Sequence, residues 1–363
     1  MKPTQALHDL GQSLWLDNIT RTLLDDATLT RYIRDFAITG LTSNPTIFEH
    51  AIGNSNAYDE AIHRKAREGK PGEALFFELA LEDLTRAADL FRPVFEASNG
   101  VDGWVSLEVS PLLAHDAART IAAAAELHAR GARPNLFIKI PGTPEGLVAI
   151  EASIFAGVPV NVTLLFSRAQ YEAAAQAYMR GIERRIAARL DPKIGSVASL
   201  FVSRWDVAAN KSLPQRLHNR LGIAVATQAW RAYRELLEST RWQTLAAAGA
   251  RAQRLLWAST GTKDPSAPDT LYVEQLAARG TINTMPEETL HAFADHGHVK
   301  QALTMQDKAA EAMLAACRLD GIDDDALAAR LQREGADAFA ASWHKLLESI
   351  ASKAARLAEN GKA

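Results

Sequence analysis

The sequence predicts a fold of the α/β class, a (β/α)8 TIM barrel with extra helices after the second strand and at the C-terminus. Eight short runs of β-type composition recur along the chain, and segments of helical period lie between them. The length of 363 residues is sufficient for one such barrel with additions. An open doubly wound sheet is the alternative fold, but no GxGxxG motif follows an early run.

The predicted strands are short apolar runs bounded by polar or turn-forming residues. In chain order they are SLWLD (13–17), AITGLT (37–42), GWVSLEV (103–109), NLFIKI (135–140), VPVNVTLLF (158–166), GSVASLFV (195–202), RLLWAS (254–259) and GTINTM (280–285).

Helical periodicity fills the intervals between these runs. DDATLTRYIRDF (25–36) carries an apolar stripe, and a helix is expected from a cap at Ser110 to Gly131. Another helix is expected to begin at Ser167. About sixty residues separate the second and third strands, which is enough for two or three helices. The last eighty residues read as helices only. We therefore expect one domain over residues 1–363, in which residues from about 300 onward form a helical extension packed on the barrel.

Composition excludes several classes of partner. The formal net charge is −3, so no basic field over the whole chain favours nucleic acid or anionic lipid. No apolar run reaches the roughly 18–20 residues of a membrane span, and the N-terminus does not resemble a signal peptide, which favours the cytoplasm. The single cysteine, Cys317, forms no intramolecular disulfide and is expected to be a buried, inert thiol.

Polar side chains stand at the predicted C-terminal ends of the strands, where barrels of this type carry their functional residues. Several are spaced by two, which places both members of a pair on one face of a strand. Polar groups on a buried inward face are costly unless they are paired or functional. The residues are Asp17, Thr42, Asn44, Glu108, Lys139, Asn161, Thr163, Ser199, Ser259 and Asn283.

Lys139 is the most informative of these residues, because apolar residues precede it on its strand. Burial of an amine favours its neutral form, and a neutral amine can attack a carbonyl to form a Schiff base. Glu108 and Asp17 are candidates for the proton transfers that this chemistry requires. From the local pattern alone, Lys139 could instead extend to solvent or pair with a carboxylate, and each acid could be a salt-bridge partner or a helix cap.

Six motifs in fixed order make the chain resemble the transaldolases, from about residue 11 to about residue 300. They are LWLDN, GLTSNPTIF, VSLEVSP, LFIKIPGT, VNVTLLFS and SLFVSRWD, and the sequence WASTGTKDP is similar to the longer bacterial and plant-type branch. The resemblance implies a class I aldolase barrel that works without metal or organic cofactor. It also implies transfer of a dihydroxyacetone unit in the pentose phosphate pathway, between sedoheptulose 7-phosphate plus glyceraldehyde 3-phosphate and erythrose 4-phosphate plus fructose 6-phosphate.

The resemblance also assigns roles to the catalytic residues. Lys139 falls on the lysine that forms the Schiff base, and Asp17 on the aspartate that removes and returns the proton of the C4 hydroxyl. Glu108 falls on the glutamate that serves the carbinolamine steps through a water, which Thr163 helps to hold.

Substrate-binding roles follow in the same way. Thr42 and Asn44 match the TSNP motif, and Asn44 and Asn161 would bind the dihydroxyacetone hydroxyls in a pocket also lined by Ser199 and Phe201. The remaining contacts would be made to the substrate phosphate. Arg204 matches the phosphate-binding arginine of the family, and a second arginine of the shorter branch is missing from WASTGTKDP, so Lys263 with Ser259 is the candidate there.

The expected partners are therefore sugar phosphates, with no nucleic acid or membrane, and the chain is expected to be a monomer or homodimer. Two alternative functions remain open. One is a Schiff-base aldolase that releases dihydroxyacetone, as fructose 6-phosphate aldolase does, and the other is a non-catalytic barrel that binds sugar phosphates. The two histidines of HGHV (296–299) lack a nearby cluster of acids or cysteines and are interpreted as surface residues, so no metal site is expected.

Overall fold

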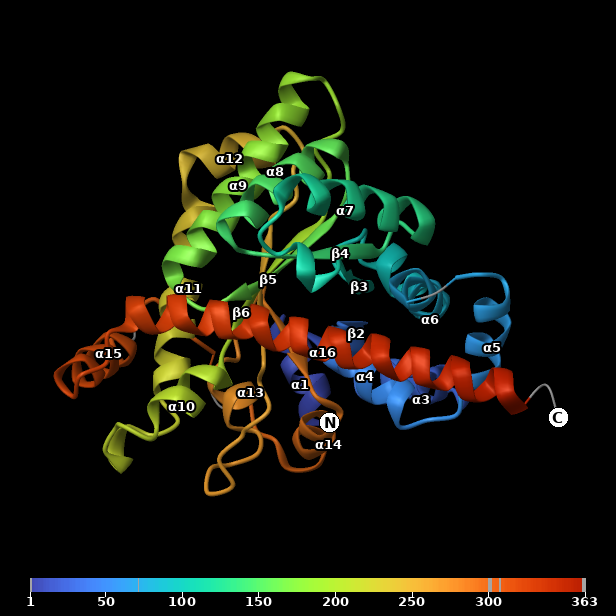
Figure 1. Cartoon of the computed structure of the whole chain (residues 1–363). Helices are drawn as coiled ribbons and strands as arrows, with labels where there is room; N and C mark the ends of the chain where they lie inside the picture. The colour runs from blue at the N-terminus through green and yellow to red at the C-terminus, as the bar shows by residue number, and fades with distance from the viewer. Residues whose placement is uncertain (1, 71, 300–301, 307, 361–363) are drawn as a thin grey trace.

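The computed structural model describes residues 2–70, 72–299, 302–306 and 308–360. Eight parallel strands close into a barrel in the order of the sequence, and the predicted (β/α)8 fold is thereby confirmed (Figure 1). Each predicted run coincides with one strand, although the fourth strand extends one residue beyond its run, to Pro141. The strands are β1 Ser13–Leu16, β2 Ile38–Leu41, β3 Trp104–Glu108, β4 Leu136–Pro141, β5 Val160–Leu165, β6 Ser196–Phe201, β7 Arg254–Ala258 and β8 Ile282–Met285.

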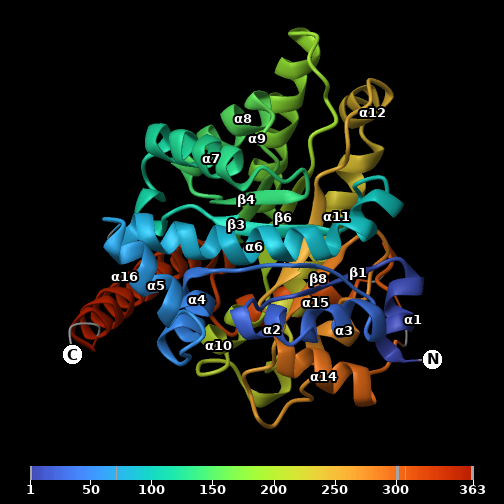
Figure 2. The ribbon, with the colours of Figure 1, turned by 90° about the vertical axis from the view of Figure 1, so that its right-hand side faces the viewer.

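Helices surround this barrel, and Figure 2 shows α6 running along the outside of β3. Up to β6 they are α1 Pro3–Leu10, α2 Arg21–Asp25, α3 Thr28–Asp35, α4 Pro45–Gly53, α5 Asp59–Arg67, α6 Gly72–Ala97, α7 Ala117–Gly131, α8 Pro144–Ala156 and α9 Arg168–Ala187. After β6 they are α10 Ser203–Ala209, α11 Leu221–Glu238, α12 Thr240–Ala247, α13 Leu271–Gln275, α14 Glu287–His296, α15 Ala309–Leu319 and α16 Asp324–Asn360, and two 3-10 turns lie at Pro111–Leu113 and Gln215–Leu217.

The helix predicted to start at Ser110 starts later, so that part of the prediction is wrong. Ser110 makes no capping hydrogen bond and is followed by the 3-10 turn. Asp116 caps α7 instead, because its carboxylate accepts a hydrogen bond from the Arg119 N–H at 3.0 Å. The predicted start at Ser167 is confirmed, since its hydroxyl accepts a hydrogen bond from the Gln170 N–H at 3.1 Å.

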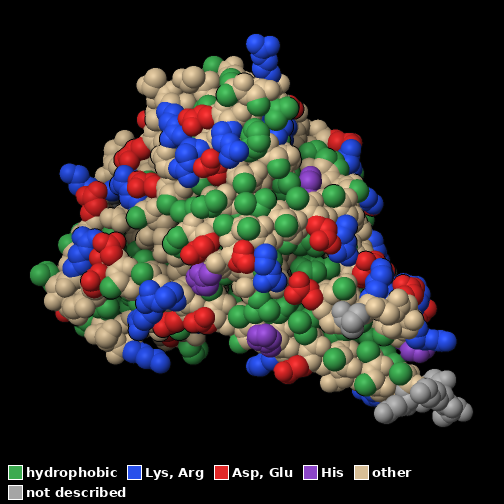
Figure 3. All heavy atoms as spheres, turned by 45° about the horizontal axis from the view of Figure 1, so that its top comes forward, with side chains coloured by type: hydrophobic (Ala, Val, Ile, Leu, Met, Phe, Trp, Pro, Cys, Tyr) green, Lys and Arg blue, Asp and Glu red, His purple; other side chains and the backbone are tan. Residues whose placement is uncertain are grey.

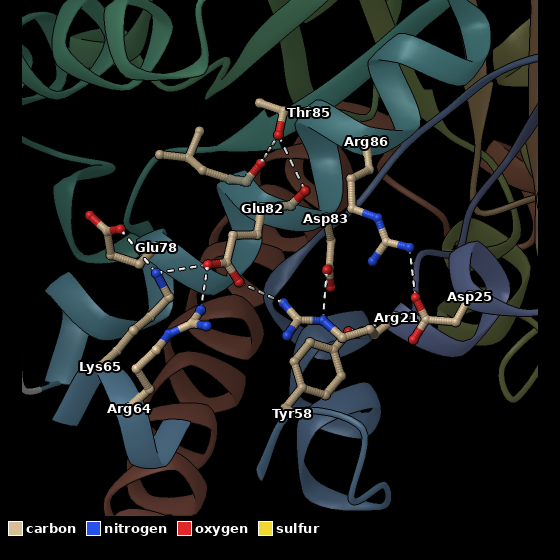
Figure 4. Close-up of polar contacts among 11 residues, drawn as sticks. Arg21, Asp25, Tyr58, Arg64, Lys65, Glu78, Glu82, Asp83, Thr85 and Arg86 are labelled. Carbon is tan, nitrogen blue, oxygen red and sulfur yellow. Dashed lines mark hydrogen bonds and ion pairs between the residues drawn. The ribbon is translucent and has the colours of Figure 1, made fainter. Parts of the chain in front are cut away.

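Three helices, α4 to α6, fill the interval between β2 and β3, in line with the prediction of two or three. An ion-pair network connects α2, α5 and α6 (Figure 4). Arg21 contacts Asp83 at 2.9 Å and Glu82 at 3.0 Å, and Lys65 contacts Glu82 at 2.8 Å and Glu78 at 3.3 Å. Because Asp83 is fully buried, the charge of Arg21 is needed to compensate it.

The N-terminal end of the barrel is closed by packed aromatic and polar side chains. The Trp104 and Phe137 rings stack with their centroids 3.9 Å apart. Asp102, just before β3, accepts hydrogen bonds from Trp15 Nε1 at 2.8 Å and from the Ser13 hydroxyl. Packed and hydrogen-bonded side chains therefore fill this end of the barrel. The polar residues predicted at the strand ends lie at the opposite end.

The long helix α16 lies across that opposite end. It packs against α4, α5 and α6. The Gln332 side-chain amide donates hydrogen bonds to two carbonyl oxygens, that of Gly142 just after β4 and that of Leu164 near the end of β5. Cys317 of α15 is buried, as predicted. Within the predicted extension, residues 300, 301, 307 and 361–363 lie outside the described residues.

The surface carries charges of both signs. Basic and acidic side chains are intermixed on the face drawn in Figure 3. Between α8 and α9, Glu151 contacts Arg180 at 2.6 Å and Arg184 at 3.1 Å, an arrangement typical of paired surface charges. No helix within the described part of the chain has the length and hydrophobicity needed to cross a membrane.

Candidate active site

A cavity of about 620 Å³ opens at the C-terminal ends of the strands. Most of the residues predicted from the sequence line it, although they come from six strands and their following loops. Those that line it are Asp17, Thr42, Asn44, Lys139, Thr163, Ser199, Phe201, Arg204, Ser259 and Lys263, whereas Glu108 and Asn161 lie behind its wall.

The parallel register explains why the central residues meet. Glu108 on β3 pairs with Lys139 on β4, which pairs with Asn161 on β5, so three polar side chains stand at one height. Lys139 Nζ lies 3.1 Å from Glu108 Oε2 and donates a hydrogen bond to the Ser43 carbonyl oxygen at 2.8 Å. The side chains of Lys139 and Glu108 are each only 6% exposed. A buried amine therefore faces one carboxylate and opens on the cavity.

Burial raises the pKa of Glu108, and the positive charge of Lys139 opposes that shift only in part. The carboxyl is therefore protonated more readily than an exposed glutamate. A group of this kind, 3.1 Å from an amine, can give a proton to the amine or to an oxygen bonded beside it and can take the proton back.

Asp17 follows β1 and differs from Glu108 in its surroundings. It accepts a hydrogen bond from the Thr42 hydroxyl at 2.6 Å, and Thr42 is itself 2.8 Å from the Thr284 hydroxyl. Burial raises the pKa of Asp17, and the Thr42 hydrogen bond and the charge of Lys139 oppose that effect. Asp17 is therefore a carboxylate of raised basicity that lines the cavity, whereas the Glu108 carboxylate forms an ion pair with the Lys139 amine.

The end of β5 carries an irregularity that directs Thr163. Leu164 has φ 58°, a left-handed conformation uncommon for leucine, and the pairing with β6 shifts between Val162 and Leu165. Within the described part of the chain, the buried Thr163 hydroxyl has no hydrogen-bond partner. Since an unsatisfied buried hydroxyl is costly, a water or substrate oxygen in the cavity would stabilise it.

The side chains of Asn44 and Asn161 both form hydrogen bonds within the protein. Asn161 accepts a hydrogen bond from the Ser199 hydroxyl at 2.7 Å and donates one to the Ser106 hydroxyl at 3.1 Å. Asn161 thus positions Ser199, which does line the cavity. Asn44 lines the cavity and also caps α4, because its side-chain oxygen accepts a hydrogen bond from the Ile47 N–H at 3.0 Å.

Arg204 provides a cation at the other side of the cavity. Its guanidinium lies 5.2 Å from the Phe201 ring centre and 5.8 Å from that of Phe339. The charge of Asp17 acts on it, but no carboxylate of the described residues forms an ion pair with it. Lys263, on the loop after β7, is exposed and lines the cavity with Ser259. A phosphate suits such a pair of cations, since neither forms an ion pair with a carboxylate of the described residues.

Sequence reasoning missed Thr284 and Phe339. Thr284 follows Asn283, the residue noted at the end of the eighth strand, but Asn283 accepts a hydrogen bond from Thr260 and does not line the cavity. Phe339 belongs to α16, beyond the motifs of the resemblance, and its place in an apolar helical stripe gave no signal of a site. His296, also singled out earlier, contacts Asp269 at 2.9 Å on the surface.

Comparison with known proteins supports the resemblance over nearly the whole chain. The model of the transaldolase/fructose-6-phosphate aldolase family matches residues 14–350, which extends the resemblance beyond residue 300 into α16. The transaldolase of Saccharopolyspora erythraea is 46% identical over 354 residues, covering 95% of this chain and 96% of the relative. Those of Thermobifida fusca (45% identical, covering 97% of this chain and 98% of the relative) and Thiobacillus denitrificans (44% identical, covering 96% and 100%) are similar at nearly the same level. The chain belongs to the transaldolase/fructose-6-phosphate aldolase family.

Proposed function

We propose that this chain is a transaldolase of the pentose phosphate pathway, which transfers a dihydroxyacetone unit through a Schiff base on Lys139. Its reaction interconverts sedoheptulose 7-phosphate plus glyceraldehyde 3-phosphate with erythrose 4-phosphate plus fructose 6-phosphate. The observation that carries the proposal is the buried Lys139 amine, 3.1 Å from Glu108, which opens on the same cavity as Asp17. Full-length relatives named transaldolase support it.

The reaction begins when the neutral Lys139 amine attacks C2 of the ketose. Glu108 exchanges protons with the amine and with the departing C2 oxygen, which leaves as water from the carbinolamine. The free Thr163 hydroxyl is placed to hold a water that relays these protons. The product is an iminium, which accepts electrons from the adjacent carbon–carbon bond.

Asp17 carries out the next step by removing the proton of the C4 hydroxyl. The C3–C4 bond breaks, its electron pair neutralises the iminium, and the first aldehyde leaves while a three-carbon enamine stays bound to Lys139. A second aldehyde then enters, its carbonyl carbon bonds to C3, and Asp17 returns the proton. Hydrolysis of the new Schiff base frees the product ketose.

Substrate binding uses the remaining residues of the cavity. Thr42, Asn44, Ser199 and Phe201 surround the dihydroxyacetone portion, and Asn161 acts on it by holding Ser199. The phosphate lies between the cationic residues at the far side. They are Arg204, Lys263 and, as a hydroxyl donor, Ser259.

Four further assignments belong to this proposal. The catalytic steps use the lysine as the electron sink, so the proposed reaction needs no metal or organic cofactor. The enzyme works in the cytoplasm as a monomer or homodimer. The barrel and the C-terminal helices form one domain, which the packing of α16 on α4, α5 and α6 supports.

Borohydride trapping with fructose 6-phosphate, followed by peptide mapping, tests the proposal. The expected result is a three-carbon adduct on Lys139, which is lost in Lys139→Met and retained in Lys263→Met, where the other lysine of the cavity is removed. An adduct on Lys263, or an unmodified Lys139, would contradict the assignment. Product analysis then separates the two activities of the family, because an aldolase releases free dihydroxyacetone without an acceptor aldehyde.

A further inference from the structure

The side of α16 that faces the barrel contributes Phe339 to the lining of the active-site cavity. Gln332, Gly335 and Phe339 are spaced by three and four residues, so they lie on one stripe of the helix. Gln332 donates hydrogen bonds to the Gly142 oxygen at 3.0 Å and to the Leu164 oxygen at 2.9 Å. The stripe is therefore attached to the ends of the two strands that carry Lys139 and Thr163.

Gly335 allows α16 to pass close to the barrel at this point. A Cβ at this position would lie 3.0 Å from Leu164 Cδ2 and 3.3 Å from Arg204 Nη1. A larger residue would therefore push α16 away from the β5 end or displace the guanidinium. One turn later, this close approach brings the Phe339 ring into the cavity.

The Phe339 ring lies close to both Lys139 and Arg204. Its centre is 6.0 Å from Lys139 Nζ and 5.8 Å from the Arg204 guanidinium carbon, and the residue is only 4% exposed. Both cations lie over the ring, which is the geometry in which an aromatic face attracts positive charge. The same apolar face offers no hydrogen bond to a water beside the amine.

We propose that Phe339 determines whether the three-carbon intermediate passes to an aldehyde or is lost to water. This inference rests on the proposed transaldolase function and adds a specificity-determining residue to it. Loss requires that C3 of the enamine takes up a proton, which regenerates an iminium. A water oxygen then bonds to C2, a proton leaves, and the C2–N bond breaks, so that Lys139 recovers its amine and dihydroxyacetone is released.

Phe339 opposes the first step of this loss, the protonation of C3. Its apolar face beside the Lys139 nitrogen offers no hydrogen bond to a water that could deliver that proton, whereas the later attack of water on C2 is common to loss and to transfer. An incoming aldehyde phosphate is not hindered in the same way, because its phosphate would be bound by Arg204, 5.8 Å from the ring centre.

Two rates measured on purified Phe339→Ala test the inference. One is release of free dihydroxyacetone from fructose 6-phosphate alone, and the other is transfer from fructose 6-phosphate to erythrose 4-phosphate. The ratio of release to transfer should rise about tenfold, or about 1.4 kcal/mol in relative activation free energy. Phe339→Leu keeps apolar bulk but lacks the aromatic face, so its ratio should lie between those of the wild type and Phe339→Ala.

Trp343→Phe is the matched control, because Trp343 lies one turn further along α16 and packs on Phe76 with ring centres 4.8 Å apart, outside the cavity. Its ratio should stay at the wild-type value. An unchanged ratio in both Phe339 variants, or an equal rise in Trp343→Phe, would overturn the assignment to this ring. Failure of the proposed function itself has a different signature, since the wild type would then show neither transfer nor a trapped adduct on Lys139.

Discussion

Replacement of Asp17 by asparagine tests the proposed division of work between the two carboxylates. The substitution keeps the shape of the side chain, and the amide oxygen can still accept the Thr42 hydrogen bond that spans 2.6 Å in the wild type. The neutral amide cannot take a proton from the C4 hydroxyl. Asp17→Asn should therefore form the Schiff base and then stop before the carbon–carbon bond breaks.

The expected magnitude follows from the role of a general base, which contributes about 10²- to 10⁴-fold to a rate. Burial raises the pKa of Asp17, so its basicity is better matched to neutral pH than that of an exposed aspartate. We therefore expect kcat to fall about 10³-fold, or about 4 kcal/mol in activation free energy.

Mass analysis of the borohydride-trapped protein is the decisive assay. With fructose 6-phosphate, wild type should give a three-carbon adduct on Lys139, whereas Asp17→Asn should accumulate the uncleaved six-carbon adduct. The variant should also lack the acid limb of the kcat/KM profile, which in the wild type reflects protonation of Asp17. A three-carbon adduct formed at the wild-type rate would refute the assigned role.

Thr42→Val provides the companion measurement, because it keeps the carboxylate and removes its hydrogen-bond donor. The Thr42 hydrogen bond lowers the pKa of Asp17, so its loss should raise that pKa further. The acid limb of the kcat/KM profile should then move to higher pH. A limb that stays in place would mean that a group other than Asp17 sets it.

Three further predictions concern other buried charges. Glu108→Gln should slow Schiff-base formation about 10²-fold in single-turnover trapping, because the amine loses its proton partner at 3.1 Å; an unchanged rate would contradict this role. Burial raises the pKa of Asp206 to about 6, so its stabilising contribution is full below about pH 4 and is lost as pH rises through 6. The stability of Asp206→Asn relative to wild type should therefore increase by up to about 3 kcal/mol between about pH 4 and pH 7 in urea unfolding, and a pH-independent difference would count against it. Arg21→Met should lower the free energy of unfolding by about 3–5 kcal/mol because it leaves the buried Asp83 unpaired, and Arg21→Met/Asp83→Leu should recover much of that loss.

The fold was predictable because it depends on signals that the sequence carries directly. Buried parallel strands are short apolar runs, and eight of them alternating with helices leave few architectures. The conformation at the end of β5 was not predictable, since Leu164 adopts φ 58° although leucine does not favour it. The sequence alone does not show that Asp116 and not Ser110 caps α7, because serine and aspartate are both good caps. The 3-10 turn at Pro111–Leu113 separates Ser110 from the helix and leaves Asp116 as the cap.

The candidate site was predictable where position on a strand determines position in space. The register that joins Glu108, Lys139 and Asn161 follows from neighbouring parallel strands of similar length. Phe339 could not be found in this way, because an apolar residue on a helix has the same pattern whether it faces a core or a cavity. Only the tertiary contact between α16 and the strand ends shows which of the two it faces.

Lys139 and Arg204 both lie over the Phe339 ring, but their proposed roles require opposite protonation states. The groups around each side chain explain how both states are reached. In the proposed mechanism Lys139 must become neutral to attack a carbonyl, and Glu108 lies 3.1 Å away to take its proton. The proposed phosphate contact of Arg204 requires a charged side chain, and a guanidinium remains protonated even where burial lowers its pKa. An exchange of the two residue types would therefore abolish both roles: arginine at 139 could not become a nucleophile, and lysine at 204 would lose the bidentate contact. The lysine at 139 and the arginine at 204 are thus each a requirement of the proposed chemistry, although both line one cavity with the Phe339 ring.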